Sequence, residues 1–323
     1  MMRGQTESKG STYVLITPAR NEEALIEKTI QSVIAQTVIP RKWVIVSDGS
    51  TDRTDEIVSH YTKSHGFIAL VRLRSRGKRD FGSKAHAFKI GYEQVKNEDY
   101  NFIGNLDADV SFDPDYYARV LEAFRRNPRM GVAGGIILDH VNGRFCKLHY
   151  HIAHVSGAVQ LFRRACFEQI GGYLPLPFGG IDSIADISAR MHGWETRTLP
   201  ELEVKHHRRI GMGQGSVLAV GFRDGVRDYS LGYRPFFELG KCIIGTHGSP
   251  RVVSGLLRIS GYFWALLRRD KPVVPKNVLT YFRSEQSQRL WSFMRAPGTA
   301  LRTRKRQMTG ENRLDRHPGS HEP

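Results

Sequence analysis

The order of apolar segments predicts an α/β protein with a mainly parallel central sheet and helices on both of its faces. Short β-rich runs alternate with segments whose apolar residues recur at helical spacing, which is the pattern of such a sheet. Aspartates follow two of these runs, and ligands of parallel sheets bind at the carboxyl ends of the strands. We therefore expect these aspartates to share one cleft. The runs lie at residues 13–17, 43–46, 67–73 and 100–106.

Local signals predict the elements in chain order. The first strand, YVLIT, is followed by Pro18 and then by a helix whose apolar residues lie three or four positions apart. The second strand turns at Asp48 into another helix, and the third precedes a glycine- and lysine-bearing loop and a helix over residues 85–95. Pro114 opens the helix after the fourth strand, and residues 131–138 predict a further strand.

The composition limits the kinds of molecule that we expect the protein to bind. The chain has 323 residues and a formal net charge of +16, which favours phosphorylated substrates, nucleic acid or an acidic membrane surface. The cysteines, Cys146, Cys166 and Cys242, lack C-x-x-C spacing, so we expect reduced, packed thiols and neither a disulfide framework nor a zinc site. The longest apolar segment, residues 252–267, carries Arg258 and is shorter than a membrane-spanning helix of about 20 residues.

Composition also divides the chain into segments. Residues 11–210 hold the predicted sheet domain, and the polar residues 1–10 before it are expected to be disordered. Over residues 211–295, glycine, aromatic and arginine residues alternate in segments that predict amphipathic helices. This pattern favours association with an acidic membrane surface, and the alternative is a helical subdomain packed on the sheet. Residues 296–323 form a basic tail that is expected to be disordered.

The sequence Asp107-Ala108-Asp109 places two carboxylates one residue apart at the end of a predicted strand. Hard cations such as Mg²⁺ and Mn²⁺ prefer oxygen ligands and bridge substrate phosphates. Aspartate pairs are also common in ordinary turns, so the pair alone is weak evidence. It gains weight from Asp48, which follows an earlier strand at the same edge of the predicted sheet.

Taken in order, several motifs resemble those of family 2 inverting glycosyltransferases, which have the nucleotide-sugar-binding GT-A fold. The resemblance covers residues 11–209 and points to bacterial exopolysaccharide and cell-envelope enzymes. It implies a GT-A fold, and the composition of residues 211–295 adds the expectation of a C-terminal helical, membrane-associated extension. The motifs are YVLITPARNEE, VIVSDGSTD, GSKAHAFKIG, NLDAD, SGAVQLFRRACFEQIGGY with GGIDSIADISARMHGW, and VKHHRR.

The resemblance implies a role for each matching residue on the donor side. Asp48 would accept a hydrogen bond from the nucleotide base, and Lys84 would approach the diphosphate at a helix start. Asp107 would contact the sugar or ribose. Ser47 and Lys89 depart from the family pattern, which has Asp and Asn at these positions. The residues expected to line the base and ribose pocket are Pro18, Ala19, Arg20 and Glu22.

The resemblance also implies a divalent cation, Mg²⁺ or Mn²⁺, held by Asp109. Relatives sometimes supply a histidine from the region of VKHHRR, and here we favour His207 over His206. The acceptor hydroxyl needs a carboxylate base within hydrogen-bond reach. Asp182 is the expected base and Asp186 the alternative, because the spacing here is two residues longer than in the family.

The predicted function is the transfer of a single sugar from a nucleotide-diphosphate sugar to an acceptor hydroxyl, with inversion. No intact Q-x-x-R-W motif of processive synthases is present, although residues 286–291 are similar to it. We expect a glycan or lipid-linked acceptor and a cytoplasmic enzyme peripheral on the inner face of the cell membrane. The alternatives are a polyprenyl-phosphate sugar synthase and, from other classes, a basic nucleic-acid-binding protein or an inactive scaffold. No nucleic-acid-binding motif is recognisable, so we expect no nucleic acid partner.

Overall fold

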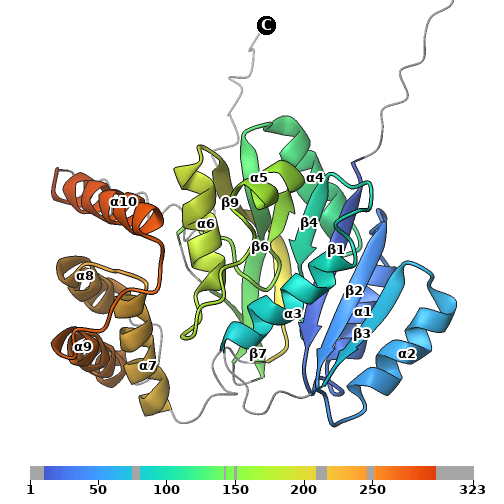
Figure 1. Ribbon diagram of the computed structural model, residues 1–323, viewed down its shortest axis with the longest axis horizontal. Helices are drawn as coiled ribbons and strands as arrows, with labels where there is room; N and C mark the ends of the chain where they lie inside the picture. The colour runs from blue at the N-terminus through green and yellow to red at the C-terminus, as the bar shows by residue number, and fades with distance from the viewer. Residues whose placement is uncertain are drawn as a thin grey trace, which may run out of the picture.

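The computed structural model describes residues 11–74, 81–141, 143–148, 151–208, 217–245 and 251–295. A sheet flanked by helices forms one part of the molecule, and a stack of helices lies beside it (Figure 1). The expected boundary near residue 210 and the two segments expected to be disordered, 1–10 and 296–323, lie outside the described residues.

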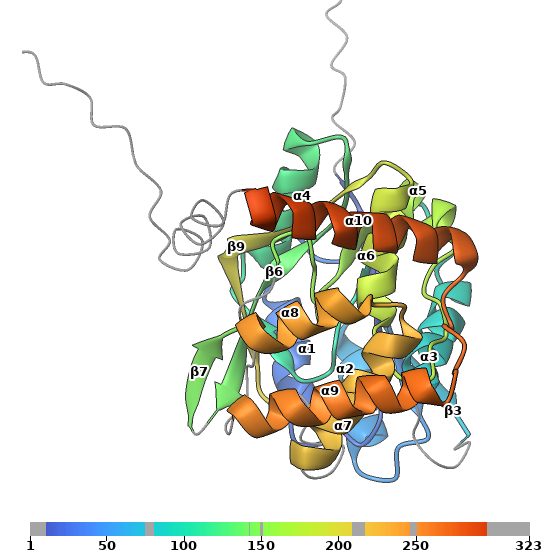
Figure 2. The ribbon, with the colours of Figure 1, turned by 90° about the vertical axis from the view of Figure 1, so that its left-hand side faces the viewer.

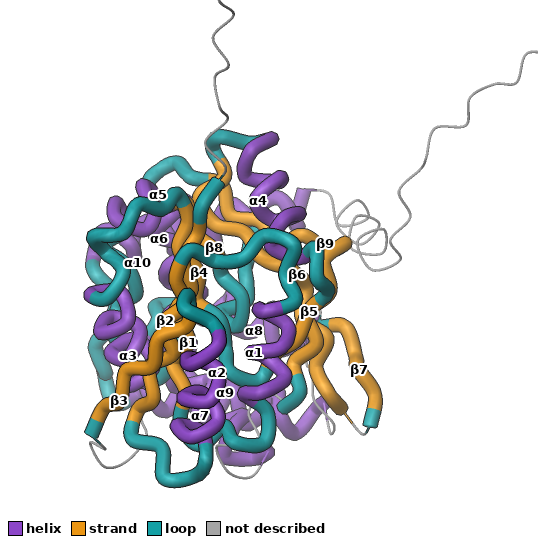
Figure 3. The backbone as a smooth tube through the Cα atoms, turned by 90° about the vertical axis from the view of Figure 1, so that its right-hand side faces the viewer, coloured by secondary structure: helices purple, strands orange, loops and turns teal. Residues whose placement is uncertain are grey.

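The first half of the sheet is parallel, as predicted. The central strand β1 (Tyr13–Ala19) pairs in parallel with β2 (Lys42–Asp48) on one side and with β4 (Phe102–Asn105) on the other. The edge strand β3 (Ile68–Leu73) pairs in parallel with β2, so these strands lie side by side in the order β3, β2, β1, β4 (Figure 3). Because all of these strands run the same way, β2 and β4 end at one edge of the sheet, which brings Asp48 and the Asp107–Asp109 turn to that edge.

The second half of the sheet is mixed, so the prediction of a mainly parallel sheet is wrong there. The strand β6 runs parallel to β9, but β8 lies antiparallel to both β4 and β6. Two further pairs, β5 with β9 and β7 with β6, are also antiparallel. Burial patterns in a sequence report which residues are covered and not the direction of the neighbouring strand. These strands are β5 (Val110–Phe112), β6 (Met130–Val141), β7 (Arg144–Lys147), β8 (Leu161–Arg163) and β9 (Glu195–His206).

Helices cover both faces of the sheet, and the alternation of side chains along β1 shows how. Tyr13 and Leu15 belong to the apolar core on one face, while Val14 and Ile16 belong to the core on the other. The helices of the first face are α1 (Ile26–Ile34), α2 (Thr54–Ser64) and α4 (Tyr116–Arg126), and those of the second are α3 (Phe81–Glu93), α5 (Arg164–Gln169) and α6 (Ile181–Met191).

The C-terminal helices pack against α6, as Figures 1 and 2 show. Arg190 of α6 forms a two-pronged ion pair with Glu285 at 2.7 and 2.9 Å. Leu231, Val278 and Phe282 pack with isoleucines of α6 in a third apolar cluster. The stack therefore supports the helix that carries Asp182. Its helices are α7 (Val217–Ser230), α8 (Pro235–Gly245), α9 (Arg251–Leu267) and α10 (Lys276–Arg295).

The amphipathic helices expected after residue 210 are thus present, and they pack beside the sheet domain. In the part of the chain that the structure describes, every helix is too short or too polar to cross a bilayer.

Candidate active site

The turn after β4 is held in place by hydrogen bonds to two other parts of the chain. The backbone N–H of Leu106 donates to Ile16 of β1, and that of Asp107 donates to Ala158 at 2.9 Å. The amide of Asn105 donates to the carbonyl oxygen of Gly157. These contacts position the two aspartates of the turn before any ligand binds, which is the preorganisation that a binding site requires.

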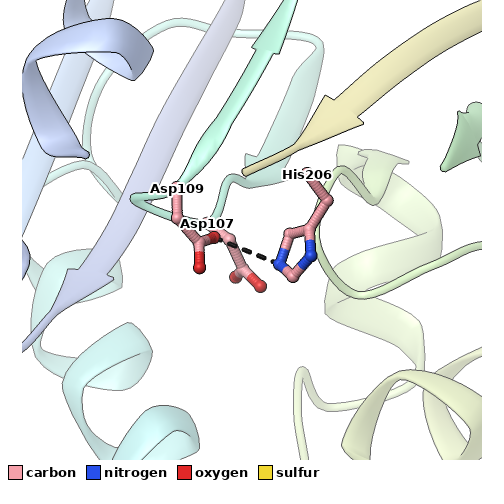
Figure 4. Close-up of side chains that lie close together, drawn as sticks. All are labelled: Asp107, Asp109 and His206. Atoms are coloured by element: carbon pink, nitrogen blue, oxygen red, sulfur yellow. Dashed lines mark ion pairs between the residues drawn. The ribbon is translucent and has the colours of Figure 1, made fainter. Parts of the chain in front are cut away.

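The pairing of β5 with β9 brings His206 to this turn. In that antiparallel pair Val110 lies opposite His206, and the backbone N–H of His207 donates to the carbonyl oxygen of Asp109 at 2.9 Å, so the end of β9 lies against the turn. His206 Nε2 lies 3.3 Å from Asp109 Oδ1. Figure 4 shows both carboxylates and the imidazole pointing toward one another.

Asp107, Asp109 and His206 fit a divalent cation. One ligand atom from each lies within 4.8 Å of the others, and Asp109 and His206 are buried. His206 Nδ1 lies 3.1 Å from Asp139, which leaves Nε2 directed at the aspartates. A carboxylate on the far nitrogen is the usual support of a metal-binding histidine, because it fixes the ring and the tautomer. Two hard oxygens with one imidazole suit Mn²⁺ and Mg²⁺.

The structure corrects the preference for His207 over His206. Successive side chains of a strand point to opposite faces, so only one of the two histidines can face the cleft. His206, the last residue of β9, faces Asp109, whereas His207 Nε2 lies 2.7 Å from Ser111 Oγ. The His207 ring also packs edge-on against Phe145, with 5.6 Å between ring centres.

This geometry predicts different effects for the two histidines. Replacing His206 with alanine is expected to weaken Mn²⁺ binding by at least about tenfold, because it removes a directed nitrogen ligand. Replacing His207 with alanine should change the Mn²⁺ dissociation constant less than about threefold, since that ring points at Ser111. Isothermal titration of each variant with Mn²⁺ measures both values. A larger loss in the His207 variant would contradict the assignment of His206.

Titration of His206 predicts a pH dependence of stability. Burial alone would lower the pKa of this imidazole, but the carboxylates of Asp109 and Asp139 raise it to about 9. A histidine in the unfolded chain titrates near 6.5, so the stabilisation is full below that pH and is lost as pH rises through about 9. With chelator present, we expect the free energy of unfolding to fall by about 3 kcal/mol across that window. Urea denaturation at several pH values measures it, and His206→Ala should remove most of the decline.

A glycine connects the turn that carries Asp107 and Asp109 with the predicted base. The Gly157 carbonyl accepts from Asn105 and from Lys84 Nζ at 3.4 Å, and its N–H donates to Asp182 Oδ2 at 3.1 Å. Lys84 Nζ also pairs with Asp107 Oδ1 at 2.6 Å. A Cβ at Gly157 would lie 2.9 Å from the Cβ of Asp182, so any side chain here would push the aspartate away. The structure thus places Lys84, Asp107 and Asp182 around one residue.

The two candidate bases differ in access to a substrate. The Asp182 side chain is 27% exposed and that of Asp186 is 1% exposed. Asp186 accepts from the backbone of Val155 at 2.8 Å, from Gln160 Nε2 at 3.0 Å and from His154. It is a buried carboxylate whose partners are all internal, whereas the partly exposed Asp182 side chain accepts only from the backbone N–H groups of Gly157 and Ser183 among the hydrogen bonds described.

His154 lies between the two aspartates. Its Nδ1 is 2.9 Å from Asp186 and its Nε2 is 4.0 Å from Asp182. Burial would lower the pKa of His154, but both carboxylates act to raise it, and the net pKa is raised. Burial would likewise raise the pKa of Asp182, yet His154, the backbone N–H groups of Ser183 and Gly157, and Lys84 lower it. Asp182 is therefore ionised at neutral pH and able to accept a proton.

The expected nucleotide pocket lies along the ends of β1 and β2. Ala19 is paired with Ser47 in the sheet, which places Arg20 beside Asp48. Arg20 Nη1 lies 3.9 Å from Asp48 Oδ2, and the Asp48 side chain is 13% exposed. Pro18 is half-buried and Ala19 is almost fully buried, so these two shape the wall mainly through their backbone.

Glu22 forms an ion pair with Arg208. Both of its carboxylate oxygens accept from the guanidinium of Arg208, one of them at 3.0 Å, and the residue is buried. Arg208 Nε also lies 3.9 Å from Asp109. Arg208 thus links Glu22, which was expected at the nucleotide pocket, to the turn that carries Asp107 and Asp109.

The structure adds His206, Asp139, Gly157 and His154 to the residues expected from the sequence. His206 stands in VKHHRR, where it was the less favoured of the two candidate histidines, and Gly157 stands in the acceptor-side motif without an expected role. Asp139 and His154 carry no local signal, because only the pairing of distant segments brings them to the cleft.

Comparison with known proteins identifies the family. Residues 14–181, more than half of the chain, match the family described as Glycosyl transferase family 2. The chain belongs to this family. The matched segment contains the first motif from its second residue onward and the motifs VIVSDGSTD, GSKAHAFKIG, NLDAD and SGAVQLFRRACFEQIGGY in full, and it ends one residue before Asp182.

Curated relatives match a part of the chain. Poly-beta-1,6-N-acetyl-D-glucosamine synthase of Staphylococcus epidermidis is 31% identical over 115 residues, which are 36% of this chain and 26% of the relative. The synthase of Staphylococcus aureus (strain COL) is 30% identical over 129 residues, 40% of this chain and 29% of the relative. The matches therefore span less than a third of the length of these relatives.

Solved structures show the fold. The mannosyltransferase PcManGT of Pyrobaculum calidifontis, in complex with GDP-Man and Mn²⁺, has a TM-score of 0.52 at 17% identity, covering 93% of this chain and 88% of that one. GalNAc-T7 with UDP, GalNAc and Mn²⁺ has a TM-score of 0.54 at 16% identity, covering 82% and 59%. The chain thus has a GT-A-like α/β fold, with the mixed sheet described above.

Proposed function

We propose that this protein transfers a single sugar from a nucleotide-diphosphate sugar to an acceptor hydroxyl, with inversion and with the help of a divalent cation. The observation that carries the proposal is the cluster of Asp107, Asp109 and His206 at the same sheet edge as Asp48 and Asp182. Membership of the family and the Mn²⁺ and nucleotide-sugar complexes of the structural neighbours support it.

On the donor side, Asp109 and His206 would hold the cation, and Asp107 would face the sugar or ribose. The bound cation would neutralise the charge that develops on the leaving diphosphate. Lys84 supplies a positive charge beside Asp107, and Asp48 offers an acceptor-only carboxylate to an N–H of the base.

On the acceptor side, Asp182 would accept the proton of the attacking hydroxyl. Its ionised state and its access to the cleft suit a general base. Attack by that hydroxyl on the anomeric carbon, from the side opposite the diphosphate, inverts the configuration in one step. The absence of an intact Q-x-x-R-W motif supports the addition of one sugar at a time.

The acceptor is proposed to be a glycan or a lipid-linked glycan of polysaccharide synthesis. Relatives that make poly-beta-1,6-N-acetyl-D-glucosamine support this class of product. The net charge of +16 and the basic, aromatic-rich C-terminal region support a position on the cytoplasmic face of the cell membrane.

A nucleotide screen tests the donor site. The melting temperature of the full chain is measured with UDP, GDP, dTDP and CDP, each with Mn²⁺ or with chelator. A ligand that binds the folded state raises its stability by mass action, so one nucleotide should raise the melting temperature in the presence of Mn²⁺ only. No rise with any of the four would contradict the proposed donor site.

A further inference from the structure

The outward side of α9 is apolar. Val253, Leu256, Phe263, Trp264 and Leu267 are exposed by 40, 61, 36, 43 and 81%. Their spacings of one, three, four and seven residues place them on one side of the helix, and we call them the α9 stripe. Figure 2 shows α9 lying with α8 and α10 on the face of the helical stack that points away from the sheet.

The one charged side chain described between Val253 and Leu267 is turned inward. Arg258 Nε lies 2.9 Å from Asp228 of α7 and 2.8 Å from Glu238 of α8, and both carboxylates are buried. The arginine that interrupts this apolar segment in the sequence therefore does not interrupt its outer surface. An ordinary surface helix has the reverse arrangement, with its apolar side inward and its charges outward.

Close backbone packing keeps α9 in this orientation. A Cβ at Gly225 of α7 would lie 1.9 Å from the carbonyl oxygen of Arg258. A Cβ at Gly261 of α9 would lie 2.0 Å from the carbonyl oxygen of Phe222. Since α7 and α9 meet through glycines and ion pairs, α9 cannot roll to bury the stripe without breaking those contacts.

Basic residues stand at the C-terminal end of the stripe. Arg268, Arg269 and Lys271 are exposed, and the only acidic residue among them is Asp270. The guanidinium of Arg268 lies over the Trp264 ring at 4.4 Å. An apolar stripe with Trp and Phe, bordered by Arg and Lys, is the composition of helices that lie in the surface of an anionic bilayer.

We propose that the α9 stripe lies in the surface of a bilayer that contains anionic lipid, with Arg268, Arg269 and Lys271 against the headgroups. This inference rests on the membrane position proposed above and names the surface responsible for it. A second copy of the chain is a poorer occupant, because two chains that each carry +16 repel one another, whereas an anionic bilayer attracts them. The helix has 17 residues and is expected to lie along the surface and not across it.

Sedimentation of the full chain with vesicles tests the proposal. Wild-type protein should bind vesicles of phosphatidylcholine with phosphatidylglycerol far more tightly than vesicles of phosphatidylcholine alone. The double variant Leu256→Ser/Leu267→Ser should need at least about tenfold more lipid for half-maximal binding. The matched control is Ile39→Ser, a 51% exposed apolar residue between α1 and β2, which should bind like wild type.

Two further measurements test which residues of the protein contact the lipid. Brominated acyl chains should quench tryptophan fluorescence on binding, and Trp264→Phe should remove most of that quenching. Replacing Arg268 and Arg269 with glutamine should reduce binding to the phosphatidylglycerol vesicles and make it less sensitive to salt.

Several outcomes would overturn the proposal. These are equal binding by wild type and the double variant, no binding by wild type, or a dimer in solution that the double variant abolishes. The nucleotide-induced rise in melting temperature, measured without lipid, reports on the donor site alone. The double variant should retain it, so a failure of the membrane contact and a failure of the proposed function give different results.

Discussion

Replacing Asp109 with asparagine is expected to lower sugar transfer by a factor on the order of a thousand. Asparagine keeps the size of the side chain but removes the charge that would face both the cation and His206 at 3.3 Å. The Mn²⁺-dependent rise in melting temperature with nucleotide should disappear at the same time. Initial rates with radiolabelled donor and the thermal measurement together test this expectation.

The matched control for Asp109 is Asp115→Asn. Asp115 stands six positions later in the chain, is 53% exposed, and lies 3.8 Å from Arg119 on the surface of α4. Its replacement should leave both the rate and the Mn²⁺ effect unchanged, since exposed ion pairs contribute little. If Asp109→Asn kept the Mn²⁺ dependence of nucleotide binding, the cation would have to lie elsewhere.

Replacing Asp182 with asparagine is expected to lower kcat by a factor on the order of a thousand, with little change in nucleotide binding. Asparagine can keep only one of the two hydrogen bonds that the Asp182 oxygens accept, from the backbone N–H of Ser183 at 2.8 Å and of Gly157 at 3.1 Å, so the stability of the variant is measured as well. It cannot accept a proton from the acceptor hydroxyl at neutral pH. Single-turnover rates, with the melting temperature as the measure of folding, separate catalysis from stability.

Asp186→Asn is the comparison variant for Asp182→Asn. The Asp186 carboxylate accepts three internal hydrogen bonds. In asparagine an NH₂ group replaces one of the two oxygens, so at least one of these donors would face another donor. We expect a loss of about 2 kcal/mol in the free energy of unfolding. A larger loss of kcat in Asp186→Asn than in Asp182→Asn would reverse the assignment of the base. A mild effect of Asp182→Asn would favour a lipid phosphate as acceptor, because that group needs no strong base.

Much of the donor side was predictable because its signals are local. The runs that became β1, β2 and β4 are continuous stretches of buried residues, and the residues that follow them are fixed in sequence. A parallel order of these strands then places Asp48 and Asp107 at one edge. Lys84 was found in the same way, from a glycine and lysine motif at the start of a helix.

The remaining parts of the site depend on contacts between distant segments. The choice of His206 over His207 follows from the register of β5 against β9, in which Val110 lies opposite His206. A shift of one residue would have exchanged the two histidines, because side chains alternate along a strand. The difference between Asp182 and Asp186 likewise depends on His154 and Gln160, which form hydrogen bonds with the carboxylate of Asp186 and not with that of Asp182.

The residues of the chain were sufficient to predict the strands and helices of the first half of the sheet, the two motif aspartates and the family to which they point. The direction of the later strands, the histidine beside Asp109, the more exposed carboxylate of α6 and the outward orientation of the α9 stripe became evident only from the packing of the folded chain. Periodicity along a chain reports which residues are buried. Which partner buries them is set by packing and register between segments that lie far apart in the sequence.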